Sequence, residues 1–366
     1  MSSETTYQLR GTKQAENQEI VSFLDRVLPF PYDQRVFSWE YDHPNMIFCT
    51  VEGPNQEVLG SQGMIPHAIH SAGGIFLSAK SETSYLDQQL QGKGLFKKLY
   101  TLAVDECREK GIKHIWGFTA LGPVWEKLGF QVQNECIEQY VIQLRVRDIN
   151  QDQTPGLASK VKGFSKMLAS LWLSSKSKRT QKRIQASYQH FERELNIREE
   201  LASESQMKNL YKRIREQYPQ LVHLEMDEYF MQNRIHENPF VQYRFRSVYD
   251  QDKNLQGYYV LAHQEGKHYA FLSDITAAKP EIKNWLIAKA CEEARGIQEI
   301  KTLQIQGNGL NQLNREAFDC FQQFGALKYM NRVYIVSLVL DQTLNEEFND
   351  FKNWYINGLW TEGVKQ

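Results

Sequence analysis

The sequence lacks the features that would place a protein in a membrane or outside the cell. It has no long apolar run, and its start, from Met1 to Glu19, is polar, so neither a transmembrane helix nor a signal peptide is predicted. Its five cysteines are scattered and include no C-x-x-C pair, which argues against a disulfide framework and a metal site. We therefore expect a soluble cytoplasmic protein with free thiols and no metal.

Net charge is almost absent as well. The formal charge of the 366 residues is −1, so no bulk electrostatic attraction favours nucleic acid, and none is expected as a partner. The chain is 41% hydrophobic and 12% aromatic, enough for a sizeable core. Its length predicts two domains, and nothing in the composition indicates an oligomeric state.

One stretch lacks acidic residues altogether. Between residues 153 and 191 the charged side chains are all basic: Lys160, Lys162, Lys166, Lys176, Lys178, Arg179, Lys182 and Arg183. Apolar residues recur there at spacings of four and three, which predicts an apolar stripe on a basic helix: Leu157, Val161, Phe164, Leu168 and Leu171.

This basic helix has two main interpretations. In the first, it links two domains, with its stripe packed on them and its lysines in water. In the second, the helix 157–183 makes a peripheral contact with an anionic membrane surface or an acidic partner. Nucleic acid is less favoured, because few aromatic residues are interleaved with the basic ones.

The first part of the chain alternates strand and helix patterns. Strands are predicted at 7–10, 46–52, 58–71, 74–86, 113–119 and within 131–145, and helices at 17–28, 95–110 and 123–128. Antiparallel strands followed by a β-α-β crossover predict an α/β, or layered α+β, domain.

The last part resembles a second copy of the first. At a shift of 185 residues, Ala103 aligns with Ala288 and Gly111 with Gly296, and the order of predicted elements repeats. We therefore predict tandem copies of one fold, each a mixed, mostly antiparallel sheet flanked by helices. The expected division is 1–148, a basic helical linker at 149–194, a degenerate copy at 195–342 and a C-terminal tail at 343–366.

Two glycines, Gly92 and Gly94, stand between a predicted strand and a predicted helix. Glycine tolerates positive φ and lets backbone amides approach a ligand closely. The helix N-terminus that follows favours an anion such as phosphate. The loop lacks the third glycine of the dinucleotide fingerprint and the Gly-Lys-Ser/Thr of a P-loop. An ordinary tight turn is the alternative to a phosphate site.

The segment from Gln89 to Gly94 resembles the Q/R-x-x-G-x-G/A pattern of the GCN5-related N-acetyltransferase (GNAT) superfamily. The flanking strand and helix are in the expected order, and "VWEKLGF" at 124–130 resembles a second motif of that family. The resemblance covers residues 1–145; for the last part it concerns topology only.

The resemblance implies that acetyl-CoA, or another acyl-CoA, is the cosubstrate and that an amine is the acceptor. The pyrophosphate would rest on backbone amides between Gln91 and Phe96, and the acyl carbonyl would enter a gap between the strands 74–86 and 113–119. The residues expected to contact acyl-CoA are Leu86, Gln89, Leu90, Gln91, Gly92, Lys93, Gly94, Leu95, Phe96, Thr119 and Trp125.

The chemistry implied by the resemblance is direct attack of an amine on the thioester, assisted by a base and, optionally, an acid. Glu82, on the strand before the loop, is the first candidate base, and Asp87 is the second. The family places a tyrosine acid where this chain has Trp125, and an indole cannot protonate a thiolate. Tyr140 or Tyr85 could replace that tyrosine, or no acid is needed because thiols leave readily.

The second copy lacks the glycine loop. At the same shift, Gln89, Gly92 and Gly94 become Asp274, Ala277 and Lys279. We therefore expect one CoA site per chain and an acetyltransferase acting on a small molecule or amino sugar. The alternatives are a catalytically silent acyl-CoA-binding or interaction protein and, less favoured, aminoacyl transfer from a charged RNA.

Overall fold

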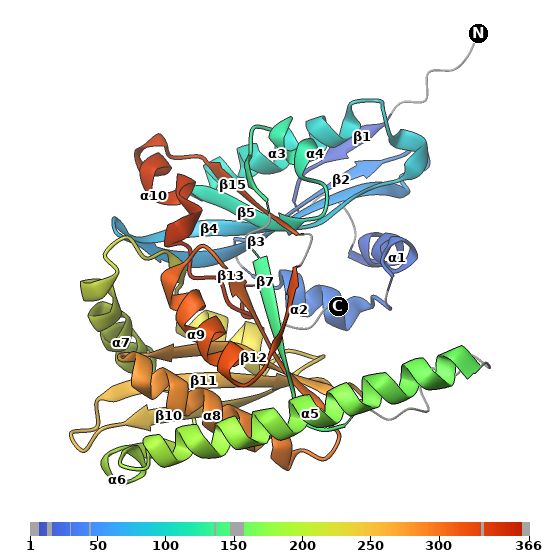
Figure 1. Ribbon diagram of the computed structural model, residues 1–366. Helices are drawn as coiled ribbons and strands as arrows, with labels where there is room; N and C mark the ends of the chain where they lie inside the picture. The colour runs from blue at the N-terminus through green and yellow to red at the C-terminus, as the bar shows by residue number, and fades with distance from the viewer. Residues whose placement is uncertain are drawn as a thin grey trace. The chain divides into compact units, whose positions relative to one another are not determined.

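The computed structural model describes residues 7–12, 17–29, 31–43, 45–134, 137–146, 157–330 and 333–360. It contains two mixed sheets flanked by helices (Figure 1), which confirms the predicted fold class. The chain forms two compact units. Unit 1 comprises Met1–Asn134, Val222–Pro239 and Val333–Asp350, and unit 2 comprises Glu135–Leu221, Phe240–Arg332 and Phe351–Gln366.

The sheet of unit 1 is mostly antiparallel, with one parallel pair, β4 and β5. In spatial order its strands are β1 (Gln8–Arg10), β2 (Ile47–Glu52), β3 (Val58–Ser71), β4 (Gly74–Leu86), β5 (His114–Thr119), β15 (Tyr334–Val339) and β6 (Gln131–Gln133), with β9 (His223–Leu224) paired to β3. Its helices are α1 (Asn17–Val27), α2 (Gln34–Tyr41), η1 (Gln88–Leu90), α3 (Leu95–Glu109), α4 (Gly122–Glu126), η3 (Phe230–His236), η4 (Gln342–Leu344) and α10 (Asn345–Asn349).

Helix α3 forms because its apolar residues recur on one face. Leu99, Ala103 and Cys107 are fully buried against the sheet, and the helix ends where Gly111 adopts a φ of 72°. The predicted helix 95–110 is therefore confirmed. Helix α2 and the π-helical turn η3 were not predicted, since neither carries a clear period in the sequence.

The sheet of unit 2 has the same mixed character. In spatial order its strands are β14 (Leu327–Met330), β7 (Ile137–Gln143), β13 (Thr302–Asn308), β12 (Tyr269–Ala277), β11 (Leu255–His263), β10 (Gln242–Tyr249) and β8 (Asn196–Arg198). Its helices are α5 (Leu157–Ser187), α6 (Phe191–Glu194), α7 (Glu204–Gln217), α8 (Pro280–Gly296), α9 (Gln312–Gln323) and η5 (Phe351–Asn353).

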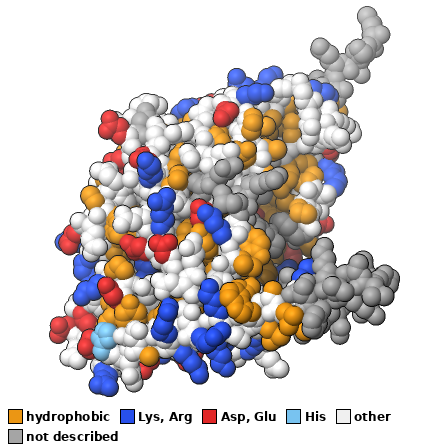
Figure 2. All heavy atoms as spheres, in the orientation of Figure 1, with side chains coloured by type: hydrophobic (Ala, Val, Ile, Leu, Met, Phe, Trp, Pro, Cys, Tyr) orange, Lys and Arg blue, Asp and Glu red, His pale blue; other side chains and the backbone are white. Residues whose placement is uncertain are grey.

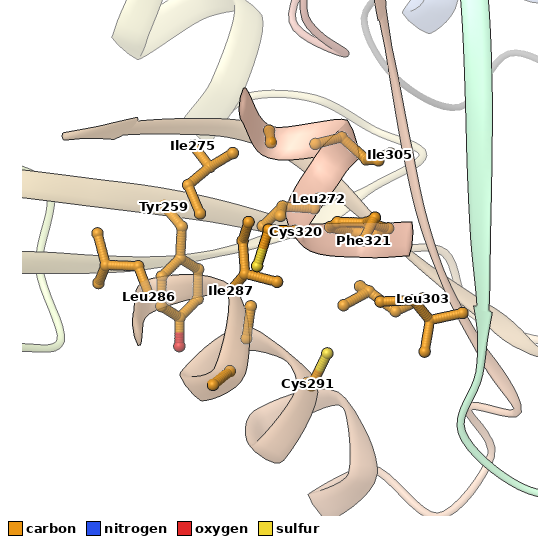
Figure 3. Close-up of a cluster of buried hydrophobic side chains, with 14 of the residues drawn as sticks. Tyr259, Leu272, Ile275, Leu286, Ile287, Cys291, Leu303, Ile305, Cys320 and Phe321 are labelled. Atoms are coloured by element: carbon orange, nitrogen blue, oxygen red, sulfur yellow. The ribbon is translucent and has the colours of Figure 1, made fainter. Parts of the chain in front are cut away.

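The core of unit 2 lies between the sheet and the helices α8 and α9. Leu286 and Ile287 of α8 and Phe321 of α9 share one cluster with Leu272 and Leu303 of the strands, and Ile287 and Phe321 lie beside Leu272 in the close-up (Figure 3). All five are fully buried, so their burial supplies much of the hydrophobic stabilisation of this unit.

The last strand of each predicted repeat pairs in the sheet of the other. Strand β15 lies between β5 and β6, and β7 lies between β13 and β14. Each compact unit therefore takes strands from both halves of the chain. Each unit is made of three separate segments of the chain. The predicted domain boundaries at 148, 194 and 342 therefore stay a prediction about the sequence repeat.

The predicted basic helix is present as α5, but the two stripe residues whose side chains are described are not packed away. Leu168 is 50% exposed and Leu171 is 41% exposed. The face that packs on unit 2 carries Ser170, Ser177 and Ile184 instead. For the described residues, the interpretation of a stripe buried against domains is wrong.

Candidate functional site: a glycine loop beside diverging strands

The glycine loop lies between β4 and α3 of unit 1. Asp87 begins it and accepts a hydrogen bond from the backbone N–H of Gln89 at 3.2 Å. Gly92 and Gly94 have φ angles of 77° and 73°, in the left-handed region that favours glycine. Leu90 is fully buried and anchors the loop to the core. The loop backbone thus needs glycine at both positions.

Packing is not the reason for either glycine. A Cβ built at Gly92 or Gly94 meets no heavy atom within 4 Å, so the backbone there borders open space. Gly94 is the N-cap of α3 and brings no side-chain cap, and the next residues are Leu95 and Phe96. Because the first N–H groups of a helix have no partner within it, this end of α3 can bind an anion.

The two parallel strands of unit 1 diverge just before this loop. Strand β4 pairs with β5 only from Ser78 to Lys80, and β5 continues to Thr119 paired with β15. The register between β3 and β4 shifts beyond Glu82, where Thr83 has a φ of 46°. Such a bulge bends β4 away from its neighbour. Among the described residues, β4 and β5 therefore lose their backbone pairing beyond Lys80, where the gap is predicted.

A buried hydrogen-bond network holds the bulge of β4. The Gln62 side chain accepts from Ser84 Oγ at 2.6 Å and donates to Ser81 Oγ at 3.0 Å. Tyr100 of α3 donates to the same Ser81 oxygen at 3.2 Å. The network ties the bent strand to both its hairpin partner and the helix. Sequence reasoning missed it, since single polar residues in a strand carry no recognisable pattern.

The candidate base Glu82 is ion-paired with a neighbour on its own strand. Lys80 Nζ lies 2.5 Å from Glu82 Oε1; the lysine side chain is 4% exposed and that of the glutamate 31%. Burial lowers the pKa of the Lys80 ammonium, and the Glu82 carboxylate opposes that shift. The carboxylate is thus held in place and still reaches solvent. Lys80 was not among the predicted site residues.

Two tyrosines lie close to this carboxylate. Tyr85, a candidate acid, is half-buried on β4, and burial together with the charge of Glu82 raises its pKa. Tyr41 of α2 was not predicted; its hydroxyl lies 2.6 Å from Thr83 Oγ1, and burial and Glu82 raise its pKa as well. Both hydroxyls therefore stay protonated near neutral pH, as a general acid requires.

Asp87, the second candidate base, has a structural role in the loop. Its carboxylate caps η1 and lies 3.9 Å from the guanidinium of Arg26. A side chain that already accepts from a backbone N–H is less suited to taking a proton from a substrate. Glu82 therefore remains the first candidate.

Tyr140, the other candidate acid, belongs to unit 2. It is 3% exposed on β7, stacks on Phe318 at a ring distance of 4.7 Å, and donates to Glu138 at 3.0 Å. The structure does not bring it into the unit that carries the loop. Its burial and its stacked partner Phe318 are those of a core residue of unit 2.

Trp125 is a core residue that also borders the loop helix. Its indole N–H donates to Thr119 Oγ1 at 3.0 Å, and its ring packs edge-on against Tyr100, Phe130 and Phe96. The side chain is 7% exposed. Since Phe96 is the second residue of α3, Trp125 supports the helix N-terminus through this contact.

We expect Trp125→Phe to retain most activity, because the phenyl ring keeps the apolar contacts and the indole N–H transfers no proton. Trp125→Ala should lower the free energy of unfolding by about 3–5 kcal/mol, the usual cost of truncating a buried aromatic residue. Melting temperatures and steady-state kinetics of both variants check this. Thr119→Val, which removes the oxygen that accepts from the Trp125 indole and also from the Leu121 backbone N–H, is the comparison variant. Loss of nearly all turnover in a well-folded Trp125→Phe protein would contradict the prediction.

Unit 2 has a similar pair of diverging strands but no loop. Strand β12 pairs in parallel with β13 only from Tyr269 to Phe271, and the register shifts opposite Leu261. Ala277 ends β12, and Lys279 is already the N-cap of α8. The short connection leaves no room for a glycine loop, as the sequence predicted.

The space beside these strands of unit 2 is filled by the segment 351–360. Asn308 of β13 donates to the carbonyl oxygens of Phe351 and Trp354, and Tyr355 donates to Asp274 of β12 at 2.9 Å. A Cβ at Gly358 would lie 2.9 Å from the Cα of Ser273. The segment 351–360 is thus packed against both β12 and β13. It occupies the place in unit 2 that corresponds to the space between β4 and β5 in unit 1.

No family model matches this sequence, and no curated protein matches it either. Solved structures do. A probable N-acyltransferase of unknown function from Enterococcus faecalis V583 matches with a TM-score of 0.60 and 10% identity, over 94% of this chain and 75% of that one. A tandem GNAT protein from the clavulanic acid biosynthesis pathway matches with a TM-score of 0.52 and 11% identity, over 91% and 99%. The chain has a GNAT fold.

A third similar GNAT-fold structure is that of the Saccharomyces cerevisiae N-myristoyltransferase with bound myristoyl-CoA. It matches with a TM-score of 0.53 and 12% identity, over 90% of this chain and 82% of that one. At such identities the likeness concerns the fold. It is nevertheless the same fold that the sequence motif predicted for residues 1–145.

The residues of unit 1 fit an acyl-CoA. The glycine backbone borders open space at a helix N-terminus, which suits a pyrophosphate. Lys93 lies beside this backbone, with its Nζ 3.3 Å from the Tyr7 hydroxyl, and can reach a phosphate. No cluster of His, Cys, Asp and Glu in the described ranges could hold a metal ion.

Proposed function

We propose that this chain is an acyl-CoA-dependent N-acyltransferase that transfers an acetyl group to a primary amine of a small molecule or amino sugar. The observation that carries the proposal is the divergence of β4 from β5 directly before the Gly92–Gly94 loop and α3. A GNAT-like fold with this geometry offers a phosphate site and a slot for the acyl group next to each other.

Within this proposal each group has a task. The acyl-CoA supplies an activated thioester. Backbone amides of the loop and of the first turn of α3 hold the pyrophosphate, and backbone groups of β4 that lack a β5 partner polarise the acyl carbonyl. Glu82 takes the proton that the amine loses as the amide bond forms and the C–S bond breaks. Tyr85 or Tyr41 can return a proton to the departing thiolate.

Two further statements belong to the proposal. One acyl-CoA binds per chain, at unit 1, because the corresponding place in unit 2 lacks the loop and holds the segment 351–360. The reaction takes place inside the cell, which fits the free and buried state of the four cysteines in the described part of the chain, Cys49, Cys107, Cys291 and Cys320.

Thiol release tests the function. The protein is incubated with acetyl-CoA or myristoyl-CoA and a panel of primary amines, and free CoA and acylated amine are measured by a thiol reagent and mass spectrometry. We expect amine-dependent release with acetyl-CoA for at least one amine. Preference for myristoyl-CoA would contradict acetyl-CoA as the proposed donor but would still support acyl transfer as the reaction.

Two observations favour a silent acyl-CoA-binding protein as the second candidate. Trp125 stands in the core where the GNAT resemblance implies a tyrosine acid, and the carboxylate of Glu82 is already ion-paired. Calorimetric binding of acetyl-CoA without thiol release for any amine would support this candidate. Absence of binding would contradict both.

A further inference from the structure

Helix α5 of unit 2 is rotated about its axis so that a face with several polar residues packs on the unit and Leu168 and Leu171 face outward. The face that packs on the unit is held by polar contacts: Ser174 Oγ donates to the Leu144 carbonyl at 2.7 Å, Thr180 Oγ1 donates to the Gln323 carbonyl at 3.1 Å, and Gln181 accepts from Arg295 at 3.0 Å. These bonds fix the rotation of the helix about its axis. Surface helices normally bury their apolar stripe, so the outward face needs a separate reason.

The outward face carries large apolar side chains. Leu168, Leu171 and Trp172 are 50%, 41% and 58% exposed, and they lie within one turn of each other. They belong to the few large hydrophobic residues on the described surface that are this exposed. Three such side chains together form a patch that water solvates poorly.

The same face continues as a basic surface. At about 3.6 residues per turn, Arg179, Lys182 and Arg183 lie within about 60° of the line through Leu168, and all three are exposed. From Leu168 to Arg183 the face extends about 22 Å along the helix axis. We name it the α5 outer face. Figure 2 shows hydrophobic side chains beside the grey atoms at the lower right and basic ones along the lower edge.

We propose that the α5 outer face docks on an anionic lipid bilayer surface. Leu168, Leu171 and Trp172 enter the boundary between headgroups and acyl chains, and the cations of the following turns lie over anionic headgroups. Lys176 lies 5.3 Å over the Trp172 ring, so it extends the cationic surface beside the inserted indole. No described helix is long and apolar enough to cross a bilayer, so the contact is peripheral.

Charge decides between the bilayer and a second copy of the chain. The segment 153–191 carries basic residues and no acidic ones, in a chain with a formal net charge of −1. In a two-fold symmetric dimer through this face, the cations of one helix would meet those of the other, and like charges repel. A surface of uniformly negative charge has no such conflict.

Cosedimentation of the full chain with vesicles tests the proposal. We expect binding to vesicles of phosphatidylcholine with phosphatidylglycerol and at least about tenfold weaker binding to phosphatidylcholine alone, with the difference reduced by added salt. Equal binding to both vesicles, or no binding to either, would overturn the proposal.

Two pairs of variants test the two parts of the face. Leu168→Ser with Trp172→Ser should weaken binding at least about tenfold, since the buried apolar area is lost. Its control is Ile197→Ser, which removes an exposed apolar side chain on β8 of unit 2. Lys182→Glu with Arg183→Glu should weaken binding at least about 100-fold, and Lys212→Glu with Lys267→Glu, the control, should have a much smaller effect.

The second copy and a weakened fold are separate outcomes of the same experiment. Sedimentation velocity without vesicles shows whether the wild type self-associates. Self-association that Leu168→Ser with Trp172→Ser abolishes, together with no vesicle binding, would assign the face to a dimer and overturn the proposal. Unchanged melting temperatures in the serine and glutamate variants would show that lost binding reflects the face itself.

Discussion

Gly92→Val should lower the affinity for acetyl-CoA by a factor of about 100 or more, equivalent to about 2.7 kcal/mol. Two effects add. Gly92 has a φ of 77°, which a β-branched residue does not adopt without strain, so the loop amides shift. The valine side chain also enters the open space beside the loop, where the pyrophosphate is proposed to lie. Isothermal titration calorimetry measures both the affinity and the number of sites.

Gly111→Val is the matched control for this change. Gly111 has a φ of 72°, also borders open space, and follows the other end of α3. It should lower the melting temperature in the same way but leave the affinity for acetyl-CoA intact. Unaltered binding in Gly92→Val, or a titration with two equivalent sites in the wild type, would contradict the single loop site.

Glu82→Gln should lower turnover by about 100-fold or more, the usual scale for loss of a general base. The amide keeps the size of the side chain and can still accept a hydrogen bond from Lys80, so the strand should keep its shape. Affinity for acetyl-CoA should barely change, because Glu82 belongs to β4 and is not part of the Gly92–Gly94 loop that is proposed to hold the pyrophosphate. Steady-state kinetics together with calorimetry separate the two quantities.

The control for Glu82 is a carboxylate of the same unit that is also ion-paired. Glu52 of β2 lies 3.0 Å from the guanidinium of Arg10, and Glu52→Gln breaks this pair without touching β4. Its turnover should stay close to that of the wild type. If Glu82→Gln turned over as fast as the wild type, Glu82 would not be the base, and Asp87 or water would be assigned that role instead.

The regular elements of unit 1 could be read from the sequence because their causes are local. Turn residues delimit the stretches that form β3 and β4, and Leu99, Ala103 and Cys107 give α3 its buried face. The glycine loop was also predictable, since a positive φ at Gly92 and Gly94 demands that residue type. The irregular η3 turn carries no such signal and was missed.

The side-chain partners of the site were not predictable. Glu82 could be placed on the strand before the loop, and Lys80 two residues earlier shares its face of β4, but the burial of Lys80 that accompanies their ion pair follows from the packing of the folded unit. Gln62 and Ser84 meet because the register of β3 and β4 shifts at this point. A register shift follows from the fit of the whole hairpin, and a sequence pattern does not show it.

The sequence by itself determined the two copies of the fold, the single glycine loop and the strong positive charge of α5. Tertiary structure decided which strands pair, because β7 and β15 find partners far away in the chain. It also decided which face of α5 is buried. Helical periodicity defines two faces, and tertiary contacts, among them the hydrogen bonds of Ser174, Thr180 and Gln181, select one for packing and leave Leu168 and Trp172 in solvent.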